Sequence, residues 1–333
     1  MTHSRQDISR LLTEHGLSPR RAFGQNFVAD ANTVRRIARL ANVGPDDLVI
    51  EIGAGLGSLT LALADTGATV IAIEVDHGIA PVLRQVVADR ANVTVVEGDA
   101  RTTDWQELVP PGRKAVVVAN LPYNVATPLI ADLLDTVPQI HRFVVMVQKE
   151  VALRLAASAG SSDYGAISVK VAYWATARLL GDVPPTVFVP QPKVTSSIIE
   201  ITRRDNPAVD VDPRELFALV RTAFGQRRKM LRRSLANVVD AADFDRAGIS
   251  PTARPEELDV VTWGRLARTV HETAKKTVTT ARTTPGTTTV LEAPAKLTLS
   301  LRITGVRDDG YHLIDAVMTS LDLCDEIRVS NIA

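Results

Sequence analysis

Short apolar runs alternate with segments of helical spacing from Asp47 to Arg203. Seven runs rich in Val, Ile and Ala predict β-strands, at residues 48–53, 68–76, 92–100, 114–123, 142–150, 177–184 and 196–204. The runs before about residue 150 are almost continuously apolar, as expected for parallel strands that helices cover on both faces. This alternation predicts a doubly wound α/β sheet.

The strand signals stop after Asn206-Pro207. Residues 212–239 and 254–272 have helical spacing, and Asp212 and Pro213 form a pair typical of a helix start. We therefore predict an α/β domain over 1–205 and a small helical domain over 206–275. The Thr-rich segment 276–289 predicts a linker, and residues 290–333 are strand-like again.

The composition is that of an ordinary globular protein. The chain has 333 residues, of which 45% are hydrophobic and 23% are charged, and this length favours two or more domains. The first residues are polar and lack the apolar core of a signal peptide, and no run approaches the roughly 18 apolar residues of a membrane span. The single cysteine, Cys324, excludes an intrachain disulfide, and a cytoplasmic location fits.

A formal net charge of zero argues against a nucleic-acid binder, but it hides a basic block at residues 221–233. This block contains no acid, and its cations are Arg221, Arg227, Arg228, Lys229, Arg232 and Arg233. On a helix, the pairs 228/232 and 229/233 would form one stripe suited to RNA phosphates. The alternative is a solvated helix face.

A glycine-rich turn, "VIEIGAGLGSLT", follows the first strand and precedes a helix. Gly53, Gly55 and Gly57 permit a tight turn and a close approach of a ligand to the backbone, although many such turns use glycine only for packing. Glu74 ends the second strand, where a carboxylate can accept both hydroxyls of a ribose. A solvated strand end explains Glu74 equally well in isolation.

Asp99 ends the third strand, where it could accept a hydrogen bond from an adenine amine. Polar residues at three successive strand ends suit an adenosyl group laid across the sheet edge. A dinucleotide is disfavoured, because the third glycine comes one residue early for its fingerprint and Glu51 would repel a pyrophosphate. The sulfonium of S-adenosylmethionine is positive and would tolerate this acid, so the residues favour a methyl donor.

The fourth strand ends in Asn120, Leu121, Pro122 and Tyr123. The amide oxygen of Asn120 and a carbonyl of Leu121 or Pro122 can accept the two N–H groups of an exocyclic amine, which directs its lone pair at a methyl group. Pro122 stiffens the turn, and Tyr123 offers a face for a flipped base. The alternative is a capped turn with a packed tyrosine.

Seven segments together resemble the ribosomal RNA adenine dimethyltransferases, in particular the small-subunit 16S enzymes. They are "FGQNF", "EIGAGLG", "NLPYN", "QKEV", "YGAISV", "FVPQPKVTSSII" and "FGQRRKMLRRSL", in order between residues 5 and 275. The resemblance implies a class I (Rossmann-like) methyltransferase domain with a small helical domain that binds rRNA. It also implies transfer of two methyl groups from S-adenosylmethionine to N6 of each of two adjacent adenosines near the 3′ end of 16S rRNA, in ribosome biogenesis.

The same resemblance implies roles for single residues. The implied cofactor-binding residues are Asn26, Val28, Gly53, Gly55, Glu74, Asp99 and Asn120. The first two should close over the cofactor, the glycines should face its methionine part, and the two acids should take the ribose and the adenine. Phe188 should close on the target base from the side opposite the Asn120 turn, although a buried anchor before two prolines is the alternative. Ala54 stands where many relatives have proline.

The tail from residue 290 resembles the N-terminal segment of diphosphocytidyl-methylerythritol kinase, of the GHMP kinase superfamily. Lys296 matches an early substrate-site lysine, and "DGYH" at residues 309–312 matches the next motif. The ATP loop and the catalytic Asp of that family have no counterpart here. We expect a truncated fragment without activity.

Other classes of protein stay open at this point. No His, Cys or carboxylate cluster has metal-ligand spacing, so we expect no metal site, and we expect a monomer. A large-subunit rRNA adenine methylase of the macrolide-resistance type shares the cofactor and target atom, but "YGAISV" and "FGQRRKMLRRSL" favour the small-subunit enzyme. A non-catalytic rRNA-binding assembly factor is a further alternative, and the presence of Asn120, Tyr123, Glu74 and Asp99 together argues against it.

Overall fold

The computed structural model describes residues 2–20, 24–280, 288–306 and 312–330. The chain divides into two compact units, residues 1–269 and residues 270–333. The predicted boundary between residues 205 and 206 lies within the first unit, and the division of this unit into two domains stays a prediction.

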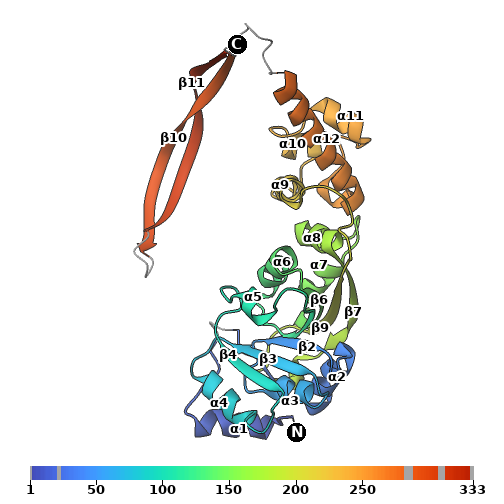
Figure 1. Cartoon of the computed structure of the whole chain (residues 1–333), viewed down its shortest axis with the longest axis vertical. Helices are drawn as coiled ribbons and strands as arrows, with labels where there is room; N and C mark the ends of the chain where they lie inside the picture. Colours follow the sequence, from blue (N-terminus) through green and yellow to red (C-terminus); the bar gives the residue numbers. More distant parts are fainter. Residues whose placement is uncertain (1, 21–23, 281–287, 307–311, 331–333) are drawn as a thin grey trace. The chain divides into compact units, whose positions relative to one another are not determined.

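A seven-stranded sheet with the order β4-β3-β2-β5-β6-β9-β7 forms the centre of the first unit (Figure 1). Its strands are β2 (Leu48–Ile52), β3 (Thr69–Glu74), β4 (Val93–Glu97), β5 (Ala115–Asn120), β6 (Ile140–Gln148), β7 (Ala175–Val183) and β9 (Ser196–Arg203). Neighbours from β4 to β6 pair in parallel, and β9 is antiparallel to both β6 and β7. All seven predicted strands, and the α/β fold class, are confirmed.

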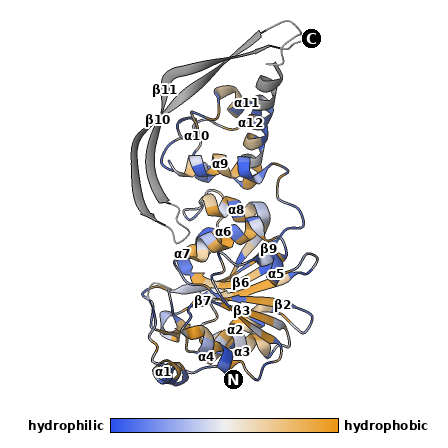
Figure 2. Ribbon diagram, turned by 60° about the vertical axis from the view of Figure 1, so that its left-hand side comes forward, coloured by the Kyte–Doolittle hydropathy of each residue, from blue (hydrophilic) through white to orange (hydrophobic). Residues whose placement is uncertain are grey.

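Helices cover both faces of this sheet because successive strand residues point to opposite sides. Val49 belongs to the core under one set of helices, while Ile50 belongs to the core under the other. The first set is α2 (Ala31–Ala41), α3 (Ser58–Ala64) and α4 (Ile79–Val86), and the second is α5 (Trp105–Leu108), α6 (Ala126–Thr136), α7 (Lys149–Ala156) and α8 (Ala166–Trp174). The central strands β2 and β5 are accordingly buried along almost their whole length, and the middle of the sheet is mostly apolar (Figure 2).

The N-terminal segment contributes helix α1 (Arg5–Glu14) and the short strand β1 (Phe27–Val28). Strand β1 pairs antiparallel with β8 (Phe188–Val189), which follows the 3-10 helix η2 (Pro185–Val187). The chain start is thereby attached to the segment that precedes the two prolines.

The helical part that follows the sheet contains α9 (Pro213–Phe224), α10 (Leu231–Ser234), α11 (Ala241–Ala247), η3 (Pro255–Glu257) and α12 (Val260–Thr280). The Asp212 side chain accepts a hydrogen bond from the backbone N–H of Arg214 at 2.8 Å, so the predicted helix start is confirmed. Tyr164 ties this part to the sheet region, because its hydroxyl donates to the Leu258 carbonyl at 2.9 Å.

Helix α12 continues to Thr280, although the sequence predicts a linker from residue 276. Residues 281–287, in the rest of the predicted linker, lie outside the described residues. The second unit then pairs β10 (Thr288–Val306) with β11 (His312–Ser330) in an antiparallel hairpin, in agreement with the strand-like pattern of this segment. Residues 309–311 of the predicted kinase-like motif also lie outside the described residues.

Candidate active site

Two adjoining pockets lie at the carboxyl ends of the parallel strands, and both are lined by Gly53, Val75 and Pro122. The residues predicted from the sequence that line the first pocket are Asn26, Val28, Gly53, Gly55, Glu74, Asn120, Leu121 and Pro122. Asp99 lines the second pocket. The structure thus brings all the predicted cofactor residues, together with Asn120, Leu121 and Pro122, to the walls of two adjoining pockets.

The glycine-rich turn between β2 and α3 has a backbone that only glycine adopts readily. Gly53, Gly55 and Gly57 have φ angles of 72°, 57° and 86°, in the left-handed region. A Cβ atom on Gly55 would lie 3.1 Å from the ring of Phe27, which packs against the turn from β1. The glycines are therefore required by the turn and by the close approach of the N-terminal segment.

Glu74, at the end of β3, is hydrogen-bonded to the glycine-rich turn. Its Oε2 accepts a hydrogen bond from the Gly55 backbone N–H at 2.7 Å, and its Oε1 accepts one from the Asp76 N–H at 3.0 Å. The carboxyl is almost fully buried, and burial raises its pKa. Both oxygens are fixed in place at the pocket wall, with further lone pairs available to a ligand hydroxyl.

Glu51 is a second buried acid in the first pocket. Only 2% of the residue is exposed, and its Oε2 has no hydrogen-bond partner among the described residues. Burial raises the pKa of this carboxyl to about 8. A buried carboxylate is costly in its charged form unless a cation lies near it, so a positively charged ligand group in this pocket would favour the ionised acid and lower its pKa.

Asn120 ends β5 and begins the turn of residues 120–123, which we call the Asn120 turn. Its side chain connects this turn to the N-terminal segment. Its Nδ2 donates a hydrogen bond to the backbone carbonyl of Asn26 at 2.9 Å, which leaves Oδ1 as an acceptor. The Pro122 carbonyl accepts the N–H groups of Val125 and Ala126, at 3.2 and 3.1 Å, at the start of α6. Of the two carbonyls predicted to accept a target amine, that of Leu121 is therefore the better placed.

The two predicted aromatic residues line neither pocket. Tyr123 is partly buried, and its hydroxyl is hydrogen-bonded to Ser196 Oγ at 2.6 Å. Phe188 has no exposed surface and packs in the core with Val28 and Ile198. For Phe188 the structure corresponds to the buried-anchor alternative, and its contact with a target base stays a prediction.

Asp99 is already engaged by a neighbouring cation. The Arg101 side chain donates to both carboxylate oxygens, with its shortest contact, from Nη2 to Oδ2, at 2.6 Å. These hydrogen bonds hold the pKa of the Asp99 carboxyl below its usual value. An adenine amine would have to share this carboxylate with Arg101, a residue that the sequence reasoning did not identify.

Gln25 is a further pocket residue that the sequence reasoning missed. Its Nε2 donates to Asp76 Oδ2 at 2.8 Å, and Arg20 forms an ion pair with the other oxygen at 3.5 Å. Asp76 is 2% exposed and follows β3 directly after the pocket residue Val75. The signal for Gln25 was present in the segment "FGQNF", where only Asn26 was singled out.

The basic block does not form the predicted helical stripe, and that prediction is wrong. Helix α9 ends at Phe224, residues 225–228 form a turn, and α10 contains only four residues. Gly225 is the C-cap of α9, and the N–H of the buried Leu231 is bonded to the distant Ala253 carbonyl at 2.8 Å and not within a helix that continues α9. All six predicted cations nevertheless lie exposed: Arg221, Arg227, Arg228, Lys229, Arg232 and Arg233. We call residues 221–233 the basic turn.

The described ranges contain no group of three or more His, Cys, Asp or Glu side chains placed to bind a metal ion. Among these same residues, no helix combines the length and the apolar character of a membrane-crossing segment.

Comparison with known proteins places this chain in a family. The sequence profile described as ribosomal RNA adenine dimethylase matches residues 16–275. A ribosomal RNA small subunit methyltransferase A from Cutibacterium acnes is 48% identical over 283 residues, which cover 80% of this chain and 93% of the relative. The protein of the same name from Rhodococcus opacus is 46% identical over 276 residues, which cover 79% of this chain and 93% of the relative.

Two solved structures share the fold over much of the chain. A dimethyladenosine transferase from Plasmodium falciparum is 25% identical with a TM-score of 0.63, covering 74% of this chain and 97% of that one. The 23S rRNA methyltransferase ErmE is 28% identical with a TM-score of 0.58, covering 74% of this chain and 99% of that one.

None of these findings supports the resemblance of residues 290–333 to a kinase, since the family profile ends at residue 275. Over the remainder, the profile covers most of the chain and the relatives match over nearly their whole length. The chain belongs to the ribosomal RNA adenine dimethylase family.

Proposed function

We propose that this protein transfers methyl groups from S-adenosylmethionine to N6 of two adjacent adenosines near the 3′ end of 16S rRNA in the small ribosomal subunit. The observation that carries the proposal is the position of Asn120, which places an amide oxygen beside the same pocket as Glu74 and the glycine-rich turn. Membership of the adenine dimethylase family and the names of the closely similar relatives support it. We expect the protein to act as a monomer in the cytoplasm.

The pocket fits the proposed cofactor in charge and in hydrogen bonding. S-adenosylmethionine supplies an activated methyl group, and it carries an ammonium, a sulfonium, a ribose and an adenine. Glu51, buried with an unpartnered Oε2, suits one of the positive groups, and the fixed Glu74 carboxylate suits the ribose hydroxyls. Asp99, in the adjoining pocket, lies where the adenine would follow.

The Asn120 turn supplies the groups that the reaction requires of the protein. An adenine amine is a poor nucleophile because its lone pair is delocalised into the ring. Two hydrogen bonds from its N–H groups, one to Asn120 Oδ1 and one to the Leu121 carbonyl, localise this lone pair and orient it for attack on the methyl carbon. The methylated amine is acidic and loses a proton without a strong base, so no basic side chain is needed at this position.

The basic turn is the part of the chain that we assign to the rRNA. It presents a dense set of exposed cations, and within the structure's described part no ion pair engages Arg228, Arg232 or Arg233. Phosphate contacts from such residues position a protein on RNA without reading its sequence.

The likeness to the 23S rRNA methyltransferase ErmE keeps a large-subunit target as a second candidate. The relatives named for the small subunit are more similar in sequence, and this favours the first candidate. Both candidates share the pocket and the Asn120 turn, so only the RNA substrate separates them.

The proposal is tested with purified protein, labelled S-adenosylmethionine, immature small subunits and large subunits from cells that lack this enzyme. We expect cofactor binding by calorimetry and label on adjacent adenosines of 16S rRNA only. Glu74→Gln should weaken cofactor binding roughly tenfold or more, because the amide cannot replace both fixed acceptors. Binding of NAD in place of S-adenosylmethionine, or label on large subunits alone, would overturn the proposal.

A further inference from the structure

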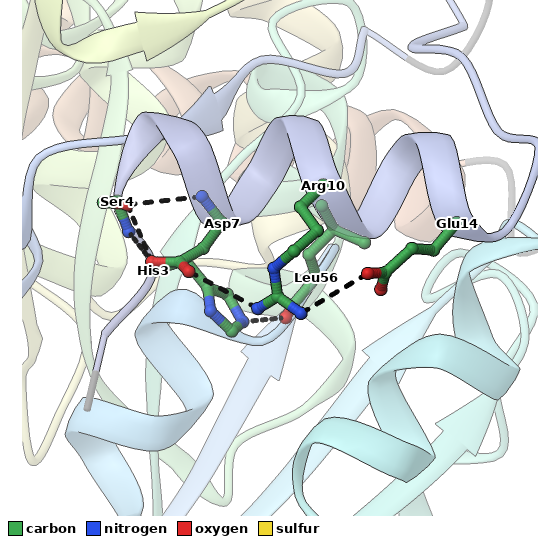
Figure 3. A network of polar contacts seen from close by, with 6 residues as sticks. All are labelled: His3, Ser4, Asp7, Arg10, Glu14 and Leu56. Atoms are coloured by element: carbon green, nitrogen blue, oxygen red, sulfur yellow. Dashed lines mark hydrogen bonds and ion pairs between the residues drawn. The ribbon is translucent and has the colours of Figure 1, made fainter.

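The segment before helix α1 is tied to the glycine-rich turn by one side chain. The ring of His3 hydrogen-bonds through Nε2 to the carbonyl of Leu56 at 2.8 Å (Figure 3). Leu56 lies between Gly55 and Gly57 in the pocket wall. A carbonyl oxygen can only accept, so Nε2 carries the hydrogen and donates this bond. Burial lowers the pKa of the His3 ring.

This bond restrains a turn that has little side-chain support of its own. Three of its residues are glycines with positive φ, and such residues exchange backbone conformations easily. The Leu56 carbonyl belongs to the same peptide plane as the N–H of Gly57, which donates to the Ala54 carbonyl at 3.0 Å. By fixing the direction of that carbonyl, His3 fixes the peptide that closes the turn.

Arg5, two residues later, is bonded to the segment that contains Phe188. Its Nη2 donates to the carbonyl of Thr186 at 2.9 Å and approaches the carbonyl of Phe188 at 3.3 Å. The segment that it holds also pairs with β1, and the Ala29 N–H donates to the Val187 carbonyl at 2.7 Å. Arg5 therefore supports the backbone that carries Phe188.

Helix α1 gives these two side chains a rigid base. Ser4 and Asp7 form a capping box at its start, and each accepts a hydrogen bond from the backbone N–H of the other (Figure 3). Ile8 is fully buried and packs in one cluster with Phe27 and Leu56. The start of α1 can hold His3 and Arg5 in place because its own position is fixed by the capping box and by the packing of Ile8.

We propose that His3 and Arg5 are positioning residues that brace the glycine-rich turn against the Phe188 segment and so set the cofactor and the target base in register for methyl transfer. We call this pair the N-terminal brace. The inference rests on the proposed function and adds two residues that lie outside every motif identified in the sequence. His3 acts through the backbone of Leu56, and Arg5 acts through the backbone of residues 186–188.

The test uses the full chain with its own N-terminus, S-adenosylmethionine and immature small subunits. His3→Ala should raise the Kd for S-adenosylmethionine roughly three- to tenfold, the effect of one missing hydrogen bond, while His3→Gln retains a donor and should recover most of the affinity. Arg5→Ala should leave that Kd near the wild-type value and lower the single-turnover rate at saturating cofactor. In a Phe188→Ala background, the same Arg5 change should have little further effect.

Arg10→Ala is the matched control on the same helix. Arg10 forms ion pairs with Asp7 at 3.4 Å and Glu14 at 3.6 Å (Figure 3). Among the described residues, its hydrogen bonds and ion pairs reach neither the glycine-rich turn nor residues 186–188. All variants are compared well below their Tm, where each is folded. If Arg10→Ala changed Kd and rate as much as the brace variants do, the effect would be general destabilisation and the inference would fail.

The brace and the proposed function fail in different ways. A wild-type protein that methylates 16S rRNA, with His3→Ala and Arg5→Ala variants of unchanged Kd and rate, overturns the brace and leaves the proposed function standing. A wild-type protein that binds no S-adenosylmethionine overturns both. A loss in His3→Gln as large as that in His3→Ala also counts against the brace, because it shows that the hydrogen bond is not what matters.

Discussion

The side-chain amide of Asn120 donates a hydrogen bond to the backbone carbonyl of Asn26 across 2.9 Å. This bond joins the end of β5 to the segment that precedes β1, which is 94 residues away in sequence. The bond also fixes the orientation of the amide: Nδ2 faces the Asn26 carbonyl, because only the nitrogen can donate to a carbonyl. The oxygen is left to accept, and this is the property that an adenine amine requires.

Asn120→Ala should therefore depress methyl transfer far more than rRNA binding. A well-oriented acceptor used in the transition state contributes roughly 3 kcal/mol, or about a hundredfold in rate. The measurement is single-turnover transfer at saturating S-adenosylmethionine, with rRNA affinity measured in parallel. Asn120→Asp keeps an oxygen but replaces the donor with an acceptor facing the Asn26 carbonyl, so it should not restore the rate. Transfer at the wild-type rate by the Ala variant would show that the Asn120 turn has no chemical role.

Glu51 gives the protein a predictable dependence of stability on pH. Burial raises the pKa of this carboxyl from 4.5 to about 8 in the folded state. Between these values the folded protein holds a proton that the unfolded chain has released, so the free energy of unfolding falls as pH rises. The slope from this one group is at most about 1.4 kcal/mol per pH unit, and it vanishes above the folded pKa.

Glu51→Gln mimics the protonated acid at every pH and serves to isolate this effect. We expect the variant to gain stability relative to the wild type between pH 5 and pH 8, as measured by denaturant unfolding at each pH. Glu74 is also buried with a raised pKa, but it is present in both proteins and largely cancels in the difference. A difference that stays constant across this range would mean that Glu51 is ionised in the folded protein at neutral pH.

The basic turn should control affinity for RNA and its dependence on salt. Replacing Arg228, Arg232 and Arg233 by Ala should weaken binding to immature small subunits and reduce the slope of log K against log salt by about 0.7–0.9 for each RNA phosphate that is no longer neutralised. Affinity for S-adenosylmethionine should not change. Arg84, which is ion-paired to Glu97 at 2.9 Å, provides a control in which a positive charge is removed elsewhere. An unchanged salt slope in the triple variant would make the basic turn only a solvated surface.

The fold was predictable because its signals are local. The apolar runs identify seven strands, and a period of two residues places neighbours such as Val49 and Ile50 on opposite faces. The order of the strands in the sheet depends on contacts between distant residues and did not come from the pattern. The helical stripe of the basic block was wrong because α9 ends at Phe224, with Gly225 as its C-cap, and the Leu231 N–H beyond it is bonded to the distant Ala253 carbonyl and not within a helix.

The site was predictable where a strand end dictates it. Glu74, Asp99 and Asn120 each end or follow a strand, and parallel strands bring their carboxyl ends to one edge. His3 was not predictable, because its partner Leu56 lies 53 residues away and only folding brings the two together. Arg101 lies two residues after its partner Asp99, and nothing in the strand-end pattern distinguishes it from other surface arginines. Phe188 is buried where β8 pairs with β1. A strand of only two residues gives no recognisable pattern in the sequence, so this pairing could not be predicted.

The hydrogen bond between the Tyr123 hydroxyl and Ser196 Oγ changes what the sequence predicts for this tyrosine. From the sequence, only the ring is needed, as a surface on which a base can stack. The structure attaches the ring to β9 through its hydroxyl at 2.6 Å, and burial raises the pKa of that hydroxyl. The hydroxyl therefore orients the ring toward one position.

Tyr123→Phe should lower the single-turnover rate about three- to tenfold, the effect of one missing hydrogen bond, while Tyr123→Ala should abolish most transfer because the stacking surface is gone. Ser196→Ala removes the partner and should lower the rate as much as Tyr123→Phe does. The double variant should be no slower than either single one, since both changes break the same bond. Additive losses would show that the two residues act separately, and a Tyr123→Phe enzyme with the wild-type rate would restore the simpler view that the ring alone matters.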